Sequence, residues 1–190
     1  ITNQILELVM HDIKNDLKKV RIKHNLFISE KKISTKTKTE KLKNQLIKMK
    51  LAYYGFQDKP KNIEESSWQK EEQLLFCSKK FGDDSDRALI KPNGELTYFM
   101  SDIIYHQNKL HRNFDTLINI WGVDHSGYVM RLKNSLVAIN KKIKYEFTIK
   151  LTSLVNLLEN NKILKMSKRS GNYITLRDVV KRVGIDVLRF

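Results

Sequence analysis

Two lysines three positions apart, Lys165 and Lys168, are the residues of this sequence with the clearest capacity for chemistry. Met166 and Ser167 lie between them, and small or polar residues follow. Paired cations in such a setting are typical of a mobile loop that folds over a polyphosphate, because the compact lysine ammonium acts as a movable point charge. It can neutralise the charge that develops as pyrophosphate departs. As a bare charge pattern, however, a solvated basic loop explains these residues more simply.

A second candidate pair is Tyr98 and Asp102, four positions apart. If a helix begins at Tyr98, the two side chains share one face of it. A carboxylate at this place can bind a planar guanidinium through two charge-assisted hydrogen bonds. The structural alternatives are a core aromatic at Tyr98 and, at Asp102, a helix N-terminal charge favoured by the helix dipole.

Three further polar residues, Gly122, Asp124 and His125, follow an apolar run at residues 116–121 that reads as a buried strand. Loops at the carboxyl ends of strands in α/β sheets commonly bind ligands. A strand-end glycine, aspartate and histidine alone are weak support for a site.

Other polar residues favour structural roles. Asp83, Asp84 and Asp86 precede Arg87, and such a group is more often made of turn formers and salt-bridge partners than of metal ligands. His106 and His111 lie in an ordinary helical pattern, which predicts structural or surface positions. We therefore expect no protein-bound metal.

The string Lys-Met-Ser-Lys at residues 165–168 resembles the second signature of class I aminoacyl-tRNA synthetases. More segments resemble arginyl-tRNA synthetases in that family's order: FGDDSDR (81–87), TYFMSD (97–102), INIWGVDHSGY (118–128) and VGID (183–186). The resemblance is strong over residues 81–190, loose over 1–30 and scarcely present over 31–70.

This resemblance implies that the parent protein activates L-arginine with ATP and transfers it to tRNA(Arg). Mg²⁺ would arrive with ATP, held largely by phosphates and water. The family's functional positions fall on three sets of residues in this chain. They are catalytic Lys165 and Lys168; ATP-binding Gly122, Asp124, His125, Met166 and Ser167; and arginine-binding Tyr98, Asp102 and His125.

The chain departs from the family pattern in two respects. Ser126 occupies a position where many members carry a second histidine, and no His-Ile-Gly-His signature occurs in the sequence. We therefore expect a piece of a longer protein, inactive by itself. A class I synthetase of another specificity and a non-catalytic nucleic-acid-binding module are the alternatives. The Tyr98–Asp102 pair and the loop at 121–125 favour arginine among specificities.

The predicted fold is α/β, the second half of a Rossmann-like parallel-sheet catalytic domain with a small inserted subdomain. Apolar spacing predicts an amphipathic helix over residues 1–20, and residues 25–29 read as a short strand. A loop is expected at 31–39, followed by a helical pattern. Strands at 74–77 and 88–90, a hairpin return at 95–99 and a helix through 103–110 precede the 116–121 strand.

Four segments follow from this organisation. Residues 1–30 are expected to belong to the catalytic domain and 31–78 to an inserted or connecting subdomain. Residues 79–180 would form the second half of the catalytic domain with its signature loop, and 181–190 the start of a following helical region.

Composition limits the remaining possibilities. With 190 residues of which 41% are hydrophobic, the chain can bury an ordinary core. A net charge of +15 favours a polyanionic partner. Since 28 of the 36 basic residues are lysine, A/T-rich coding bias explains the charge equally well. A single cysteine, Cys77, suits a reducing compartment, so we expect a cytoplasmic location. No apolar run approaches the roughly 20 residues of a membrane helix, so no membrane partner is expected. The sequence does not define the oligomeric state, and a monomeric parent is the expectation.

Overall fold

The computed structural model describes residues 2–57, 70–140, 145–153, 155–159, 162–163 and 174–190. The chain divides into two compact units, one of residues 28–154 and one that combines residues 1–27 with 155–190. Each unit is described by itself. The four-segment domain division expected from the sequence stays a prediction.

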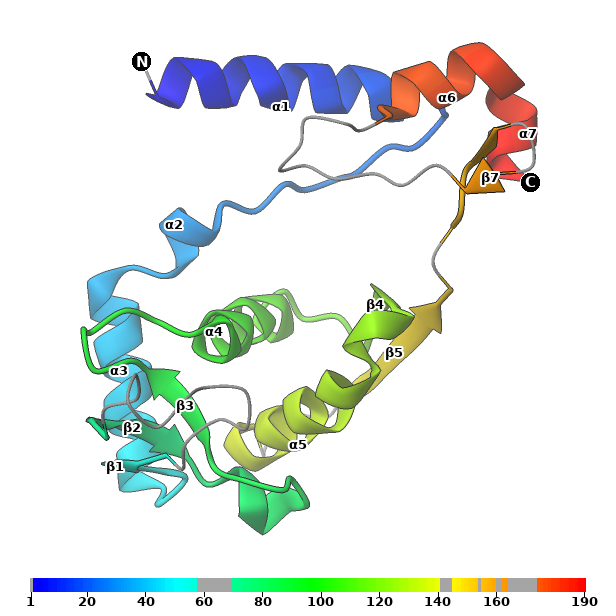
Figure 1. Cartoon of the computed structure of the whole chain (residues 1–190). Coiled ribbons are helices and arrows are strands. Elements are labelled where there is room, and N and C mark those ends of the chain that lie inside the picture. Colours follow the sequence, from blue (N-terminus) through cyan, green and yellow to red (C-terminus); the bar gives the residue numbers. More distant parts are fainter. Residues whose placement is uncertain (1, 58–69, 141–144, 154, 160–161, 164–173) are drawn as a thin grey trace. The chain divides into compact units, whose positions relative to one another are not determined.

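The unit of residues 28–154 contains two sheets and the helices that pack on them (Figure 1). Strands β1 (Ala52–Phe56), β2 (Glu72–Phe76) and β3 (Arg87–Ile90) form an antiparallel sheet in that order. Strands β4 (Thr116–Gly122) and β5 (Glu146–Thr152) pair in parallel. The helical elements are α2 (Glu30–Ile33), α3 (Lys36–Lys48), η2 (Ser78–Phe81), α4 (Tyr98–Leu110), η3 (Val123–Tyr128) and α5 (Val129–Ile139).

Strands β4 and β5 form a βαβ unit because α5 lies between them in the chain. Leu117 and Asn119 of β4 are buried, whereas Ile118 and Ile120 are exposed. This alternation follows from the period of two along a strand, with one covered face. Strand β4 thus ends at Gly122, and η3 follows directly at the carboxyl end of the parallel pair.

The core of this unit lies where α3, α4 and the antiparallel sheet meet. Its fully buried side chains include Leu46, Leu74, Leu89, Met100 and Ile103. Burying an aliphatic side chain of this size contributes about 1.5–3 kcal/mol. Truncating Met100 or Ile103 to alanine would cost about 2–5 kcal/mol. Helix α4, which begins at Tyr98, is therefore fixed firmly to the sheet.

The second unit contains α1 (Thr2–Lys19), α6 (Leu176–Val183), α7 (Ile185–Arg189) and the short antiparallel pair β6 (Leu158–Glu159) and β7 (Lys162–Ile163). Arg177 of α6 donates to both carboxylate oxygens of Asp16 in α1, at 3.0 and 3.2 Å. Thr175 and Asp178 form a capping box at the start of α6. Polar contacts therefore join α1 and α6.

The α/β fold class expected from the sequence is confirmed, as are helices at 1–20 and through 103–110 and strands at 74–77, 88–90 and 116–121. The strand predicted at 25–29 is wrong, because this segment is irregular and no strand in the described part of the chain pairs with it. The loop predicted at 31–39 is also wrong, because α2 and α3 occupy most of it. Thr35 caps α3, and Thr39 is buried on this helix together with Leu42, about one turn further along.

The turn of the hairpin predicted before residues 95–99 is correct, but the returning strand is not. Gly94 adopts a positive φ of 83°, which glycine accommodates without strain. A single bridge joins Ile90 and Leu96, and then Thr97 caps α4. The helix cap replaces the second strand.

Candidate active site

Thr97 fixes the start of α4 and so positions the predicted arginine-binding pair. Its hydroxyl accepts from the Met100 amide at 3.3 Å and donates to the Ala88 carbonyl at 2.7 Å. The helix begins at Tyr98, as the spacing argument required, so Tyr98 and Asp102 lie one turn apart. Both line one pocket of about 230 Å³, together with Ile28, Glu30, Ile33, Ser101 and Tyr105.

Asp102 is the half-buried carboxylate of this pocket. Burial raises its pKa above the ordinary value. The Tyr128 hydroxyl opposes that rise, Glu30 adds to it, and His125 and Lys109 oppose it. Among the described residues neither Asp102 nor Glu30 forms an ion pair. The pocket therefore combines two carboxylates with no cation bound to either.

A buried hydrogen-bonded chain holds α4 against β4. The Lys109 ammonium donates to Asn119 Oδ1, and Asn119 Nδ2 donates to His106 Nε2, both at 2.7 Å. His106 Nδ1 in turn lies 2.7 Å from the Asp102 carbonyl oxygen, to which it donates. Burial lowers the pKa of His106 to about 4, so the ring is neutral near pH 7. The structural role predicted for His106 is confirmed, and His111 is exposed at the end of α4.

The carboxyl end of β4 brings the predicted loop residues together. Gly122 ends the strand, and Asp124 and His125 follow in η3, with His125 Nε2 3.5 Å from Asp124 Oδ2. Both of these side chains are exposed. The His125 ring lies 6.0 Å from the Trp121 ring. His125 also helps to lower the pKa of Asp102, so the loop after β4 contributes to the electrostatics of the α4 pocket.

A different carboxylate, Asp83, forms an ion-pair cluster beneath α5. Arg87 donates to Asp83 through Nε at 3.0 Å and Nη2 at 2.8 Å, and Arg131 Nε donates at 2.7 Å. These hydrogen bonds hold the pKa of Asp83 well below its usual range, and those from Arg87 contribute most. Arg87 also contacts Asp84, and Asp86 accepts from the Tyr53 hydroxyl at 2.8 Å. The salt-bridge role is confirmed for Asp83 and Asp84, whereas Asp86 accepts hydrogen bonds from the Tyr53 hydroxyl and the Lys79 amide.

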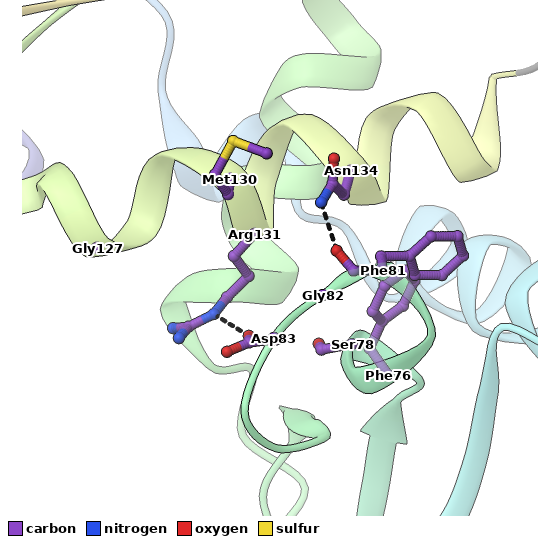
Figure 2. Close-up of a pocket in the computed structure, with 9 residues that line it drawn as sticks. All are labelled: Phe76, Ser78, Phe81, Gly82, Asp83, Gly127, Met130, Arg131 and Asn134. Atoms are coloured by element: carbon purple, nitrogen blue, oxygen red, sulfur yellow. Dashed lines mark hydrogen bonds and ion pairs between the residues drawn. The ribbon is translucent and has the colours of Figure 1, made fainter.

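Figure 2 shows the hollow beside this cluster, with the Arg131 guanidinium directed at Asp83 and Asn134 donating to the Phe81 carbonyl at 2.6 Å. Its volume is about 100 Å³. Ligand pockets are usually several times larger. This hollow therefore belongs to the joint between η2 and α5.

Two residues near Asp102 were not among the site residues predicted from the sequence. Glu30 lines the pocket, and the sequence signal for it was an acidic residue two positions after the apolar pair Phe27 and Ile28. Tyr128, which affects the pKa of Asp102, lies in segment 118–128, where Gly122, Asp124 and His125 were predicted instead. The predicted Lys165, Met166, Ser167 and Lys168 lie outside the described residues.

Within the described ranges, no helix is long and apolar enough to cross a membrane. The same ranges contain no group of three or more His, Cys, Asp or Glu side chains able to hold a metal ion.

The chain is similar to arginine–tRNA ligases over nearly all of its length. It is 45% identical to the one from Pelagibacter ubique (strain HTCC1062) over 178 residues, which is 94% of this chain and 31% of that protein. It is 43% identical to the one from Wolbachia pipientis wMel over 190 residues, 100% of this chain and 33% of that protein. A Campylobacter jejuni crystal structure assigned as an arginyl-tRNA synthetase superposes with a TM-score of 0.75 at 29% identity, covering 97% of this chain and 36% of that one.

No family model matches the chain. The chain spans about a third of the length of the curated relatives it matches. These similarities confirm the resemblance to arginyl-tRNA synthetases, with this chain corresponding to one part of them.

Proposed function

We propose that the protein carrying this chain activates L-arginine for protein synthesis. The arginine carboxylate attacks the α-phosphorus of ATP, forms arginyl-adenylate and expels pyrophosphate. A hydroxyl of the terminal adenosine of tRNA(Arg) then attacks the arginyl carbonyl and releases AMP. The similarity to proteins named arginine–tRNA ligases supports this proposal.

The observation that carries the choice of amino acid is the pair of carboxylates in the α4 pocket. Asp102 and Glu30 line the same 230 Å³ space as the exposed Tyr98, and neither has a cationic partner in the described part of the chain. Two like charges near each other favour a cation between them. A guanidinium supplies that charge together with several donors in one plane. The pocket chemistry thus favours arginine over amino acids with neutral or acidic side chains.

The ATP side of the proposal uses the carboxyl end of β4 and the signature loop. Gly122, Asp124 and His125 would approach the adenosine, with Met166 and Ser167 contributing from the loop. Lys165 and Lys168 would act at the phosphates, where Lys168 stabilises the charge that develops on departing pyrophosphate. Mg²⁺ would come with ATP, bound by its phosphates and water and not by protein ligands of this chain.

The remaining expectations form part of the same proposal. The partner nucleic acid is tRNA(Arg), the location is the cytoplasm, and the parent acts as a monomer. The four-segment division proposed from the sequence gives residues 79–180 the catalytic role.

Pyrophosphate exchange by the full-length protein tests the function. With tRNA(Arg) and Mg²⁺ present, labelled pyrophosphate should enter ATP when L-arginine is supplied. L-citrulline, which replaces the guanidinium with a neutral urea of similar shape, should support little exchange. Glutamate and cysteine serve as further controls for other class I specificities.

Two results would overturn the proposal. Exchange dependent on another amino acid would assign a different specificity. Tight tRNA binding without exchange for any amino acid would favour the non-catalytic nucleic-acid-binding module.

A further inference from the structure

The Tyr128 hydroxyl is buried and has no partner at normal hydrogen-bonding geometry in the described residues. A buried hydroxyl left unpaired costs about 1–3 kcal/mol. It nevertheless lies near enough to Asp102 for the two groups to act on each other's pKa. No hydrogen bond among the described residues explains why this hydroxyl is buried.

The Tyr128 ring is fixed from three sides. Phe99 meets it edge-on with ring centres 6.0 Å apart, and Trp121 lies 5.7 Å away. The Arg131 guanidinium lies 5.5 Å from its centre, in the range of a cation–π contact. Arg131 is itself held by Asp83 at 2.7 Å. The hydroxyl therefore has little freedom to turn away from the pocket.

We propose that Tyr128 is a positioning residue of the arginine pocket: its hydroxyl donates to the Asp102 carboxylate and orients it to receive the guanidinium. The Asp83–Arg131 ion pair holds the ring in place for this task. The inference rests on the proposed function and adds to it a residue that does not itself touch arginine.

The charges around Asp102 define the expected pH behaviour. Glu30 of α2 raises the pKa of Asp102, as does burial, whereas Tyr128 and His125 of η3 and Lys109 of α4 lower it. Removing the Tyr128 hydroxyl therefore raises the pKa of Asp102 further. Since guanidinium binding needs the ionised carboxylate, arginine affinity must then fall at a higher pH than in the wild type.

The test uses Tyr128→Phe in the full-length protein, because phenylalanine keeps the ring packing and removes only the hydroxyl. Tyr145→Phe is the matched control, since the Tyr145 hydroxyl is also buried without a partner in the described residues but its pKa is raised by burial and not by Asp102. The measurements are the KM values for arginine and ATP in pyrophosphate exchange between about pH 5.5 and 8.5, with the melting temperature.

Tyr128→Phe should raise the KM for arginine about tenfold, in line with the loss of one hydrogen bond to a charged group. It should also move the acid limb of the arginine profile to higher pH and leave the KM for ATP unchanged. Arg131→Gln should act in the same direction with a smaller shift.

Three outcomes are decisive. If the wild-type protein shows no arginine-dependent exchange, the proposed function fails and not this inference alone. If the wild type is active and Tyr128→Phe matches Tyr145→Phe, Tyr128 does not position Asp102. Equal increases in both KM values with a lower melting temperature would show that Tyr128 only supports the fold, and would equally overturn the inference.

Discussion

Asp83 and Asp102 are carboxylates of the same compact unit in opposite electrostatic states. Asp83 accepts hydrogen bonds from the guanidinium groups of Arg87 and Arg131, which hold its pKa far below the ordinary value. Asp102 has no guanidinium partner in the described residues, and burial raises its pKa. Within this unit, Asp83 is thus a satisfied guanidinium acceptor, whereas Asp102 is an open acceptor among the described residues.

This difference separates a structural carboxylate from the carboxylate that we propose binds arginine. A satisfied carboxylate stabilises the fold, because its pairing lowers the free energy of the ionised form. An open, half-buried carboxylate does the reverse, since desolvation destabilises its ionised form and no cation offsets the cost. Holding Asp102 in that condition is useful only if a cationic ligand later supplies the missing charge.

The largest loss of activity is expected from a change at Lys168. This lysine is proposed to act in the transition state, whereas the two aspartates act in ground states. Lys168→Ala should lower the rate of adenylate formation about 10²–10³-fold, or roughly 2.7–4 kcal/mol. Dissociation constants for arginine and ATP should change little. Single-turnover kinetics across both substrate concentrations measures these quantities. Lys48→Ala, an exposed lysine at the end of α3, is the control. Weakened ATP binding alone would contradict the transition-state role.

Asp102→Asn tests the open acceptor directly. Replacing the charged acceptor should weaken arginine binding about ten- to a hundredfold, or roughly 1.5–3 kcal/mol, with ATP binding unchanged. The melting temperature should not fall, because the substitution also removes a poorly solvated charge. Isothermal titration with arginine and with ATP gives both constants. Parallel losses for the two ligands would mean that Asp102 shapes the fold.

Asp83→Asn tests the satisfied acceptor and should do the opposite. We expect a loss of about 1–2 kcal/mol in the free energy of unfolding at pH 7, since two partly buried guanidinium groups lose their charged partner. The pKa of Asp83 is depressed, so its contribution is present above the unfolded pKa of about 4 and is lost as pH falls towards the folded value. Denaturant melts of both proteins between pH 3 and 7 should therefore converge at acid pH. A constant difference would show that charge is not the cause.

Glu30→Gln should give the smallest effect. Glu30 is exposed, and exposed ion pairs contribute about 0.2–1 kcal/mol, so arginine affinity should fall only up to about fivefold. The effect should shrink further in high salt because water and ions screen the charge. Arginine titrations at two salt concentrations check this. A loss as large as that of Asp102→Asn would make Glu30 an equal partner in the pocket.

Local spacing predicted the helix through residues 103–110 and that Tyr98 and Asp102 would share a face if the helix began at Tyr98, whereas residues 95–99 were expected to return as a hairpin strand. The salt-bridge role of Asp83 was also predictable, since Arg87 is only four residues away. Arg131, the second partner, is 48 residues distant in the chain and carried no local signal.

Errors arose where tertiary contacts override local composition. Residues 31–39 look like a polar loop, yet Ile33 and Thr39 are buried against the core and the segment is largely helical. Residues 25–29 have a strand-like composition but no strand beside them to complete a ladder. Glu30 remained hidden because its relevance depends on the fold that brings α2 to α4.

The Thr97 cap has a consequence for how this region can evolve. Its hydroxyl is anchored to the carbonyl oxygens of Ala88 and Leu89, so it recognises the backbone of β3 and not the side chains there. Selection for a correctly placed Tyr98 and Asp102 therefore falls on the threonine itself, while a lineage remains free to exchange residue 88 for other strand-forming types. A change of side chain in β3 that keeps its backbone in place therefore leaves the start of α4, and with it Tyr98 and Asp102, unmoved.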